Sequence, residues 1–298
     1  MKSLKILFIT ALAATQFSCT ESEDSIIDDV ISTTSAIESI NAVTFEEEVS
    51  DLVSEGMEYY IPSLRNKTEI TDLKQSSSPG RYRFNDCADI VVDEENNTKT
   101  ITFIEDCENN RGKNRAGTIV ITYSDENDQV GSFRQTEYID FYINNVKMEG
   151  IRRSEVISID ENGNKTTLNT LTGGKMIYED GTFSTKSAEY TRFVYIQDDE
   201  KIYSTLEGNS EGVSTEGISF SMEIITPIKF LYNCTNPSSK KRKRIPVEGV
   251  KNILNADTLT IIDFGEGECD RDVNVTINGE TEILDLKELK RNSFFRIR

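Results

Sequence analysis

The stretch ISFSMEI, residues 218–224, decides the fold class of this chain. Apolar residues alternate with polar ones over its whole length, and a period of two is the signature of a β-strand with one buried and one solvated face. Residues 138–143 alternate in the same way, with Ile139, Phe141 and Ile143 expected on one face. Both stretches favour an antiparallel sheet, because such a sheet presents one face to a core and the other to water.

Turn-forming dipeptides divide the region around these stretches into hairpins. Three of them stand where tight turns require positive φ: Asn162-Gly163, Asp180-Gly181 and Asn278-Gly279. Asn145 is expected to begin another turn between two long strands, and no useful helical periodicity follows Ser63. The sequence therefore predicts a mainly β fold over residues 81–298, either an antiparallel sandwich or a curved β-meander.

The N-terminus carries an export signal. Residues 1–19 read MKSLKILFITALAATQFSC, with Lys2 and Lys5 ahead of an apolar run that is shorter than the ~20 residues a membrane-spanning helix needs. Ser18-Cys19 resembles a lipobox, in which the Cys thiol is acylated, although Gln16 stands where a lipobox usually has Leu. We expect residues 1–18 to be a lipoprotein signal peptide and Cys19 to be the lipidated N-terminus. The alternative is an ordinary secretory signal with an incidental Cys.

Two segments separate the lipid anchor from the β domain. Residues 19–35 are polar and acidic, which is typical of a flexible tether. Residues 36–80 are expected to form a short N-terminal helical segment and a linker, because Thr44 and Glu47 make a capping-box pair ahead of apolar residues at helical spacing. Those apolar residues are Phe45, Val49, Leu52, Val53 and Met57.

The number of cysteines is consistent with export. The chain has five Cys, and lipidation of Cys19 leaves an even number in an oxidising compartment. We favour Cys87–Cys107 and Cys234–Cys269, since each pair brackets a local block with a strand rich in Thr and Ile. These blocks form a weak internal repeat, so the β domain is expected to contain two similar disulfide-stapled halves. Four free buried thiols and a chance similarity between the blocks are the alternatives, and the absence of a C-x-x-C pair disfavours a zinc site.

The same blocks carry a resemblance to known proteins. Two segments, residues 98–125 and 260–270, resemble a group of uncharacterised surface lipoproteins of flavobacteria and other Bacteroidetes. The first segment contains the motifs Arg111-Gly112-Lys113 and Thr122-Tyr123. The acidic patch at residues 20–24 resembles the post-cysteine signals of surface-exposed lipoproteins in these bacteria. The resemblance implies an outer-membrane lipoprotein of β architecture, exposed at the cell surface, with no known activity and no catalytic residue to assign.

Composition narrows the possible functions. The formal net charge of −19 disfavours a nucleic-acid partner, because phosphate binding needs clustered Lys and Arg. The chain has no His, which excludes Ser-His-Asp and Cys-His catalysis and imidazole zinc sites. A hydrolase would have to use paired carboxylates, for which Glu137 with Asp140, or Asp263 with Glu266, are the candidates. We interpret all four as solvated strand and turn residues.

Two further motifs have simple structural interpretations. Residues 160–164 and 125–128 are oxygen-rich loops of the kind that calcium binds, but the first is more simply a hairpin turn. The basic run at residues 240–244 is interpreted as a solvated loop, with contact to an anionic glycan as the alternative.

These observations predict a non-catalytic envelope lipoprotein that acts as a structural or binding module. It is held at the membrane through the lipid anchor on Cys19, needs no cofactor or metal, and binds a protein or glycan that the sequence does not identify. The first alternative is a lipid- or glycan-binding carrier whose curved sheet cups an apolar ligand. The second is a carboxylate-based glycan hydrolase.

Overall fold

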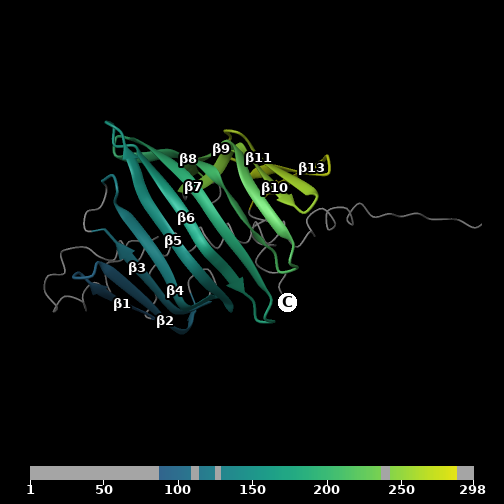
Figure 1. Ribbon diagram of the computed structural model, residues 1–298. Coiled ribbons are helices and arrows are strands. Elements are labelled where there is room, and N and C mark those ends of the chain that lie inside the picture. Colours follow the sequence, from purple (N-terminus) through teal and green to yellow (C-terminus); the bar gives the residue numbers. More distant parts are fainter. Residues whose placement is uncertain (1–86, 109–113, 125–128, 236–241, 287–298) are drawn as a thin grey trace, which may run out of the picture.

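The computed structural model describes residues 87–108, 114–124, 129–235 and 242–286 (Figure 1). These residues form a single sheet of 13 strands whose order follows the sequence from β1 to β13. Neighbouring strands are antiparallel, from the β1–β2 pair to the β12–β13 pair. The mainly β prediction is therefore confirmed, and of the two expected architectures the chain adopts the meander.

The strands vary from 6 to 17 residues in length and are joined mostly by short hairpin turns. Their bounds are β1 Ala88–Asp93, β2 Thr98–Glu108, β3 Asn114–Tyr123, β4 Phe133–Ile143, β5 Val146–Ile159, β6 Lys165–Ile177, β7 Phe183–Gln197, β8 Glu200–Val213, β9 Ser219–Thr235, β10 Arg242–Asn255, β11 Thr258–Glu266, β12 Asp272–Ile277 and β13 Glu280–Asp285. Among the described residues, no helix is long and apolar enough to cross a membrane. Several predicted features lie outside the described residues: the signal peptide 1–18, the lipidation site Cys19, the tether 19–35 and the helical segment 36–80.

One face of the sheet is buried, and we call it the inner face. In β9, Phe220 and Met222 are buried whereas Ser221 and Glu223 are exposed, as the alternation at residues 218–224 predicts. Two apolar clusters lie on this face. The first, on β1–β6, has Ile101, Ile119, Ile121, Phe141 and Ile143 at its centre, and the second, on β7–β13, contains Met222, Ile228, Phe230, Ile253, Ile262 and Val275.

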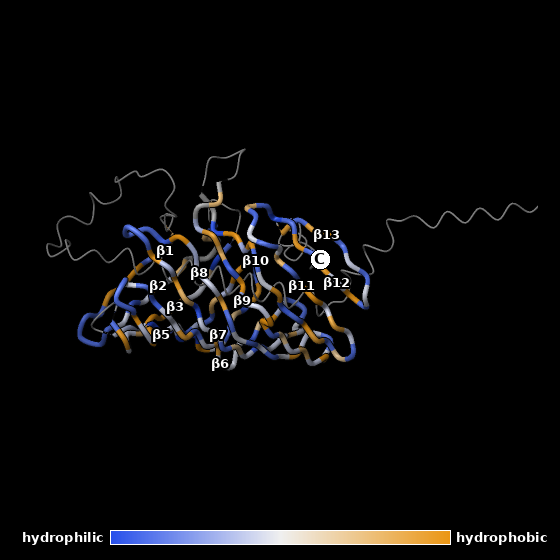
Figure 2. The backbone as a smooth tube through the Cα atoms, turned by 90° about the horizontal axis from the view of Figure 1, so that it is seen from above, coloured by the Kyte–Doolittle hydropathy of each residue, from blue (hydrophilic) through white to orange (hydrophobic). Residues whose placement is uncertain are grey.

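The sheet is strongly curved, so that β1 and β13 lie on the same side of the central strands when it is viewed from above (Figure 2). Bulges with positive φ interrupt the register of successive strand pairs, for example at Gly117 in β3 and Gly249 in β10. Such bulges bend the strand that carries them and increase its twist. The meander therefore curves because its sequence places bulges along the sheet, not only at its edges.

One bulge overturns part of the sequence analysis. Asp140 has a φ of 43°, and the β4–β5 register shifts between Glu137 and Phe141. Phe141 is buried, but Ile139 is 56% exposed and so does not share its face as expected. Tyr138 takes that place instead and stacks on Phe141 with ring centroids 5.8 Å apart.

The predicted turns are confirmed. Asn278 and Gly279 have φ values of 52° and 88°, as a two-residue hairpin turn requires. Asn144 and Asn145 form an equivalent turn between β4 and β5, with φ values of 47° and 66°. At Asp180-Gly181 only the glycine has positive φ, and the loop closes through hydrogen bonds from Gly181 N to Tyr178 O and from Tyr178 N to Thr182 O. Gly163 is likewise the only residue of its dipeptide with positive φ.

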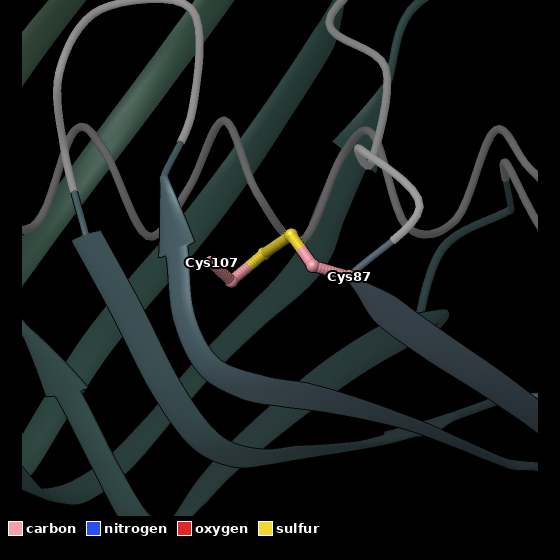
Figure 3. Close-up of a disulfide and its surroundings, with 2 residues drawn as sticks. All are labelled: Cys87 and Cys107. Atoms are coloured by element: carbon pink, nitrogen blue, oxygen red, sulfur yellow. A yellow bond between two sulfur atoms is a disulfide. The ribbon is translucent and has the colours of Figure 1, made fainter.

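Both predicted disulfides are present. Cys87, just before β1, is bonded to Cys107 in β2 across a sequence separation of 20 (Figure 3). Cys234 in β9 is bonded to Cys269 after β11, so this bridge spans β10 and has a sequence separation of 35. The two bridges thus connect their strands differently, and both lie within one continuous sheet. The existence of two similar halves stays a prediction.

Candidate functional site

The charged residues that are buried in the described part of the chain are all positive, although the Oε2 atom of the half-buried Glu282 is also buried. Lys99, Arg115, Lys186 and Lys251 are buried with at most 8% exposure, and no Asp or Glu is buried among the described residues. This is unexpected in a chain with 52 acidic and 33 basic residues. The edge strand β13 carries Glu282 opposite the buried Val275, at the far end of the sheet. The inner face is therefore a mainly cationic surface within an acidic protein.

The period of two in each strand places these cations among the core residues. Lys99 precedes Ile101 by two residues in β2, and Lys251 precedes Ile253 by two in β10. Residues two apart in a strand share a face, so each lysine lies on the inner side next to a fully buried isoleucine. Acidic residues occupy the intervening outer positions of the central strands and are exposed: Glu189, Glu207, Glu211 and Glu223.

Aromatic rings of the inner face lie beneath several of these cations. The guanidinium of Arg244 is 4.1 Å from the centroid of the Phe230 ring, and that of Arg192 is 6.0 Å from the same ring. Similar contacts join Arg115 to Phe103, Lys186 to Tyr190 and Lys251 to Phe264, at 5.9, 6.0 and 5.6 Å. A cation over an aromatic face gains about 0.5–2 kcal/mol, more when water is excluded. The rings therefore help to hold positive charge on this face.

Lys99 shows how strongly the environment acts on one of these charges. Burial, together with the smaller effect of the nearby positive charge of Arg134, lowers the pKa of Lys99 to about 8. Two cations thus lie close together on β2 and β4. Strongly shifted groups of this kind are found preferentially at functional sites, although structural charge networks also produce them.

Three buried hydroxyl groups lie on the central strands. Ser184 in β7 and Ser204 and Ser210 in β8 are 3%, 0% and 2% exposed. Their Oγ atoms have no hydrogen-bond partner within the part of the chain that the structure describes. Leaving a buried hydroxyl without a partner costs about 1–3 kcal/mol, so these groups are suited to donate to an acceptor that packs on the face.

The carboxylates predicted as hydrolase candidates have other roles. Asp140 forms an ion pair with Lys147, with 2.9 Å between Oδ1 and Nζ, and the Asp140 side chain is 75% exposed. Glu137 is exposed and accepts a hydrogen bond from Gln135 Nε2. Asp263 accepts a hydrogen bond from the backbone of Gly265, and Glu266 is exposed. Nothing in these arrangements sets one carboxylate of a pair against the other across a bound substrate.

The oxygen-rich loop at residues 160–164 is a hairpin turn. Asp160 accepts hydrogen bonds from the backbone of Asn162 and Asn164 and from the side chain of Asn164, and these bonds lower the pKa of Asp160. In the described ranges no group of three or more His, Cys, Asp or Glu residues could hold a metal ion. The second loop, residues 125–128, lies outside them.

The basic run is not wholly a solvated loop. Its last three residues, 242–244, belong to β10, and the half-buried Arg244 lies over the Phe230 ring with the Tyr232 ring centroid 5.8 Å away. Arg244 belongs to a run of like charge, which makes it visible in the sequence. Lys99, Lys186 and Lys251 were not predicted, because they stand singly among apolar or small residues. The signal that finds them is a cation in phase with the apolar side of an alternating strand.

The chain matches no protein-family model, and neither the curated proteins nor the solved structures include a significantly similar one. The function is therefore inferred from the chemistry of the inner face.

Proposed function

We propose that the chain is a non-catalytic lipoprotein of the bacterial envelope, anchored through Cys19, and that it acts as a binding module for an anionic amphiphile. The binding surface is the inner face of the sheet. The observation that carries the proposal is that the four charged residues buried in the described part of the chain are all Lys or Arg and lie on a face with two apolar clusters. The export signal and the lack of His support the envelope location and the non-catalytic role.

The central strands have the groups that such a ligand needs. Its anionic group would lie near Lys186 and Arg192 on β7, with the hydroxyl of Ser210 on β8 available as a donor. Hydrogen bonds to a charged group contribute about 1.5–3 kcal/mol each. Its hydrocarbon part would pack on the apolar clusters, at about 0.8 kcal/mol for each buried methylene. Both halves of the ligand are thus required for tight binding.

A labelled fatty acid tests this proposal. The probe is 11-(dansylamino)undecanoic acid, its neutral control is the methyl ester, and the protein is the chain with Cys19→Ser, purified without detergent. We expect the acid to bind with a micromolar Kd and the ester at least tenfold more weakly, because only the acid has a charge for the cations. Failure of the acid to bind, or equal binding of acid and ester, would overturn the proposal.

Variants locate the site. Replacing Lys186 and Arg192 together with Met should weaken binding of the acid about tenfold and leave ester binding unchanged, since Met retains the apolar contact. The matched control is Lys201→Met, at an exposed position of β8. An equal loss in the control would mean that general charge attraction, not the inner face, binds the acid.

A further inference from the structure

The inner face is fully buried at positions far apart in the sheet. Ile101, Ser204 and Ile253 are 0% exposed, although they lie on strands distributed across the sheet. All described elements are strands of one sheet, and their substantial contacts join sequential strands. A sheet buries a face only when another layer packs on it. We propose that the inner face is the docking surface for residues 44–58 of the same chain.

Charge narrows the choice of occupant among the remaining parts of the chain. No Lys or Arg lies between Thr20 and Leu64, and residues 44–58 contain Glu46, Glu47, Glu48, Asp51, Glu55 and Glu58. The loops at 109–113 and 236–241 and the tail at 287–298 are basic, and the acidic loop at 125–128 has four residues. None of the buried cations is without an interaction partner. Residues 20–43 contain six further acids, so the charge complementary to the face belongs to the whole stretch 20–64. The apolar pattern of residues 44–58 selects the segment within it.

The same segment has an apolar side that matches the clusters. At 100° per residue, Phe45, Val49 and Leu52 fall on one side of a helix. Glu48 and Glu55 border that side, about 40–60° from Leu52, and Ser54 lies opposite. A helix placed with its apolar side on the sheet would therefore direct a row of carboxylates toward the cations of the inner face.

Dimensions allow the docking. Residues 44–58 would form a helix about 22 Å long, which spans four to five strands at about 4.8 Å spacing. Strands β7 and β10 are three such spacings apart, about 14 Å. Through Gly212 and Phe220, Lys186 lies opposite Asn255, and Lys251 is four residues, about 13 Å, farther along β10, so the two lysines are about 19 Å apart. Residues 59–86, which connect the segment to Cys87, can extend to about 90 Å. That is about twice the distance from β1 to β10, so the connection is long enough for any position on the face.

The docking has a consequence for binding. The segment offers carboxylates and apolar side chains, which are the two features of the proposed ligand. An anionic amphiphile and the segment would therefore compete for the inner face. Docking by itself does not depend on the proposed function, whereas this competition rests on it.

Photo-crosslinking tests the docking in the full chain with Cys19→Ser. p-Benzoylphenylalanine replaces Leu52 on the apolar side, and the matched control replaces Ser54 on the opposite side. Benzophenone reacts readily with methionine, and Met148, Met176 and Met222 are all buried on the inner face. We expect intramolecular adducts to one of these methionines from position 52, in at least fivefold higher yield than from position 54. Adducts confined to outer-face residues or to a second copy, or equal yields, would overturn the docking.

Two additions separate the possible outcomes. One triple variant replaces Glu48 with Gln, Asp51 with Asn and Glu55 with Gln, and it should reduce the adduct yield from position 52 several-fold. The control triple variant replaces the exposed Glu207, Glu211 and Glu223 with Gln, and it should leave this yield unchanged. Equal effects of the two triple variants would contradict charge-directed docking. Saturating dansyl-undecanoic acid should also reduce the yield, and its methyl ester should not. If the acid binds without reducing the yield, the competition is wrong and both the docking and the proposed function stand. If no adduct forms but the acid binds, only the docking fails.

Discussion

Gly117 lies so close to Asp140 that a Cβ atom on the glycine would be 1.8 Å from the Asp140 carbonyl oxygen. The two residues oppose each other at the bulge between β3 and β4, and both have positive φ, 87° and 43°. The close approach of two backbones, which only glycine permits, bends the sheet here. The curvature of the first cluster therefore depends on a single missing side chain.

Gly117→Ala should destabilise the protein by more than about 2 kcal/mol, because both the positive φ and the backbone clash oppose a methyl group. Gly131→Ala is the matched control, since Gly131 has a φ of 91° but nothing within 4 Å of the added Cβ atom. That variant should lose only about 1 kcal/mol. Urea denaturation measures both. Equal losses would show that the approach to Asp140 is not a constraint.

Removing the disulfides should cost stability according to the chain length that each one closes. Replacing Cys87 and Cys107 with Ser should reduce the free energy of unfolding by about 3 kcal/mol, the chain-entropy value for a loop of 20 residues. The Cys234–Cys269 bridge closes 35 residues, so its removal should cost slightly more, close to 4 kcal/mol. Urea denaturation of each double variant checks the order. A negligible loss for either pair would contradict this entropic account.

Lys99→Met should stabilise the protein at neutral pH. The pKa of Lys99 is about 8 in the folded chain and 10.5 in the reference state, so the unfolded chain binds the proton more tightly. The lysine therefore destabilises the fold at pH 7, and this cost disappears as pH rises from about 8 to 10.5. The advantage of Lys99→Met should be larger at pH 7 than at pH 10 by about 2 kcal/mol. Chemical denaturation at both pH values measures this difference, and an advantage independent of pH would argue against burial of the charge.

Cys19→Ser should move the protein from the membrane fraction to the soluble fraction. Acyl chains bind membranes at about 0.8 kcal/mol per buried methylene, so several chains on one Cys hold a protein firmly. Fractionation of cells that produce each form measures the change, and Ser25→Thr, which lies outside the lipobox and retains the Cys, is a suitable comparison. Continued membrane association of Cys19→Ser would contradict lipid anchoring.

The sequence predicts strands and turns well here because local patterns determine them. Alternation in residues 218–224 and the Asn278-Gly279 dipeptide each specify a geometry within a few residues. The disulfides were predictable because each Cys pair brackets a local block. Alternation does not specify which sheet a strand joins, so it could not separate the meander from a sandwich.

The sequence-based predictions fail in two situations. In one, a single residue changes the register of a strand, and in the other, a charged residue stands alone on the apolar side of a strand. The bulge at Asp140 moves Ile139 to the outer face, and no local pattern distinguishes Asp140 from an ordinary outward-facing acid. The inner-face lysines are not part of a run of like charge, so charge runs in the sequence do not reveal them. Lys99 and Lys251 are single residues, and their meaning depends on the neighbouring positions two residues away.

The central claim is that the cations of the inner face are covered, and lysine acetylation of the intact chain tests it most directly. Each lysine of the protein with Cys19→Ser is followed by mass spectrometry during brief treatment with the N-hydroxysuccinimide ester of acetic acid. We predict that Lys99, Lys186 and Lys251 react at least tenfold more slowly than the exposed Lys201, even though the lowered pKa of Lys99 would by itself speed its reaction. Reaction of these three lysines at the rate of Lys201 would contradict the claim.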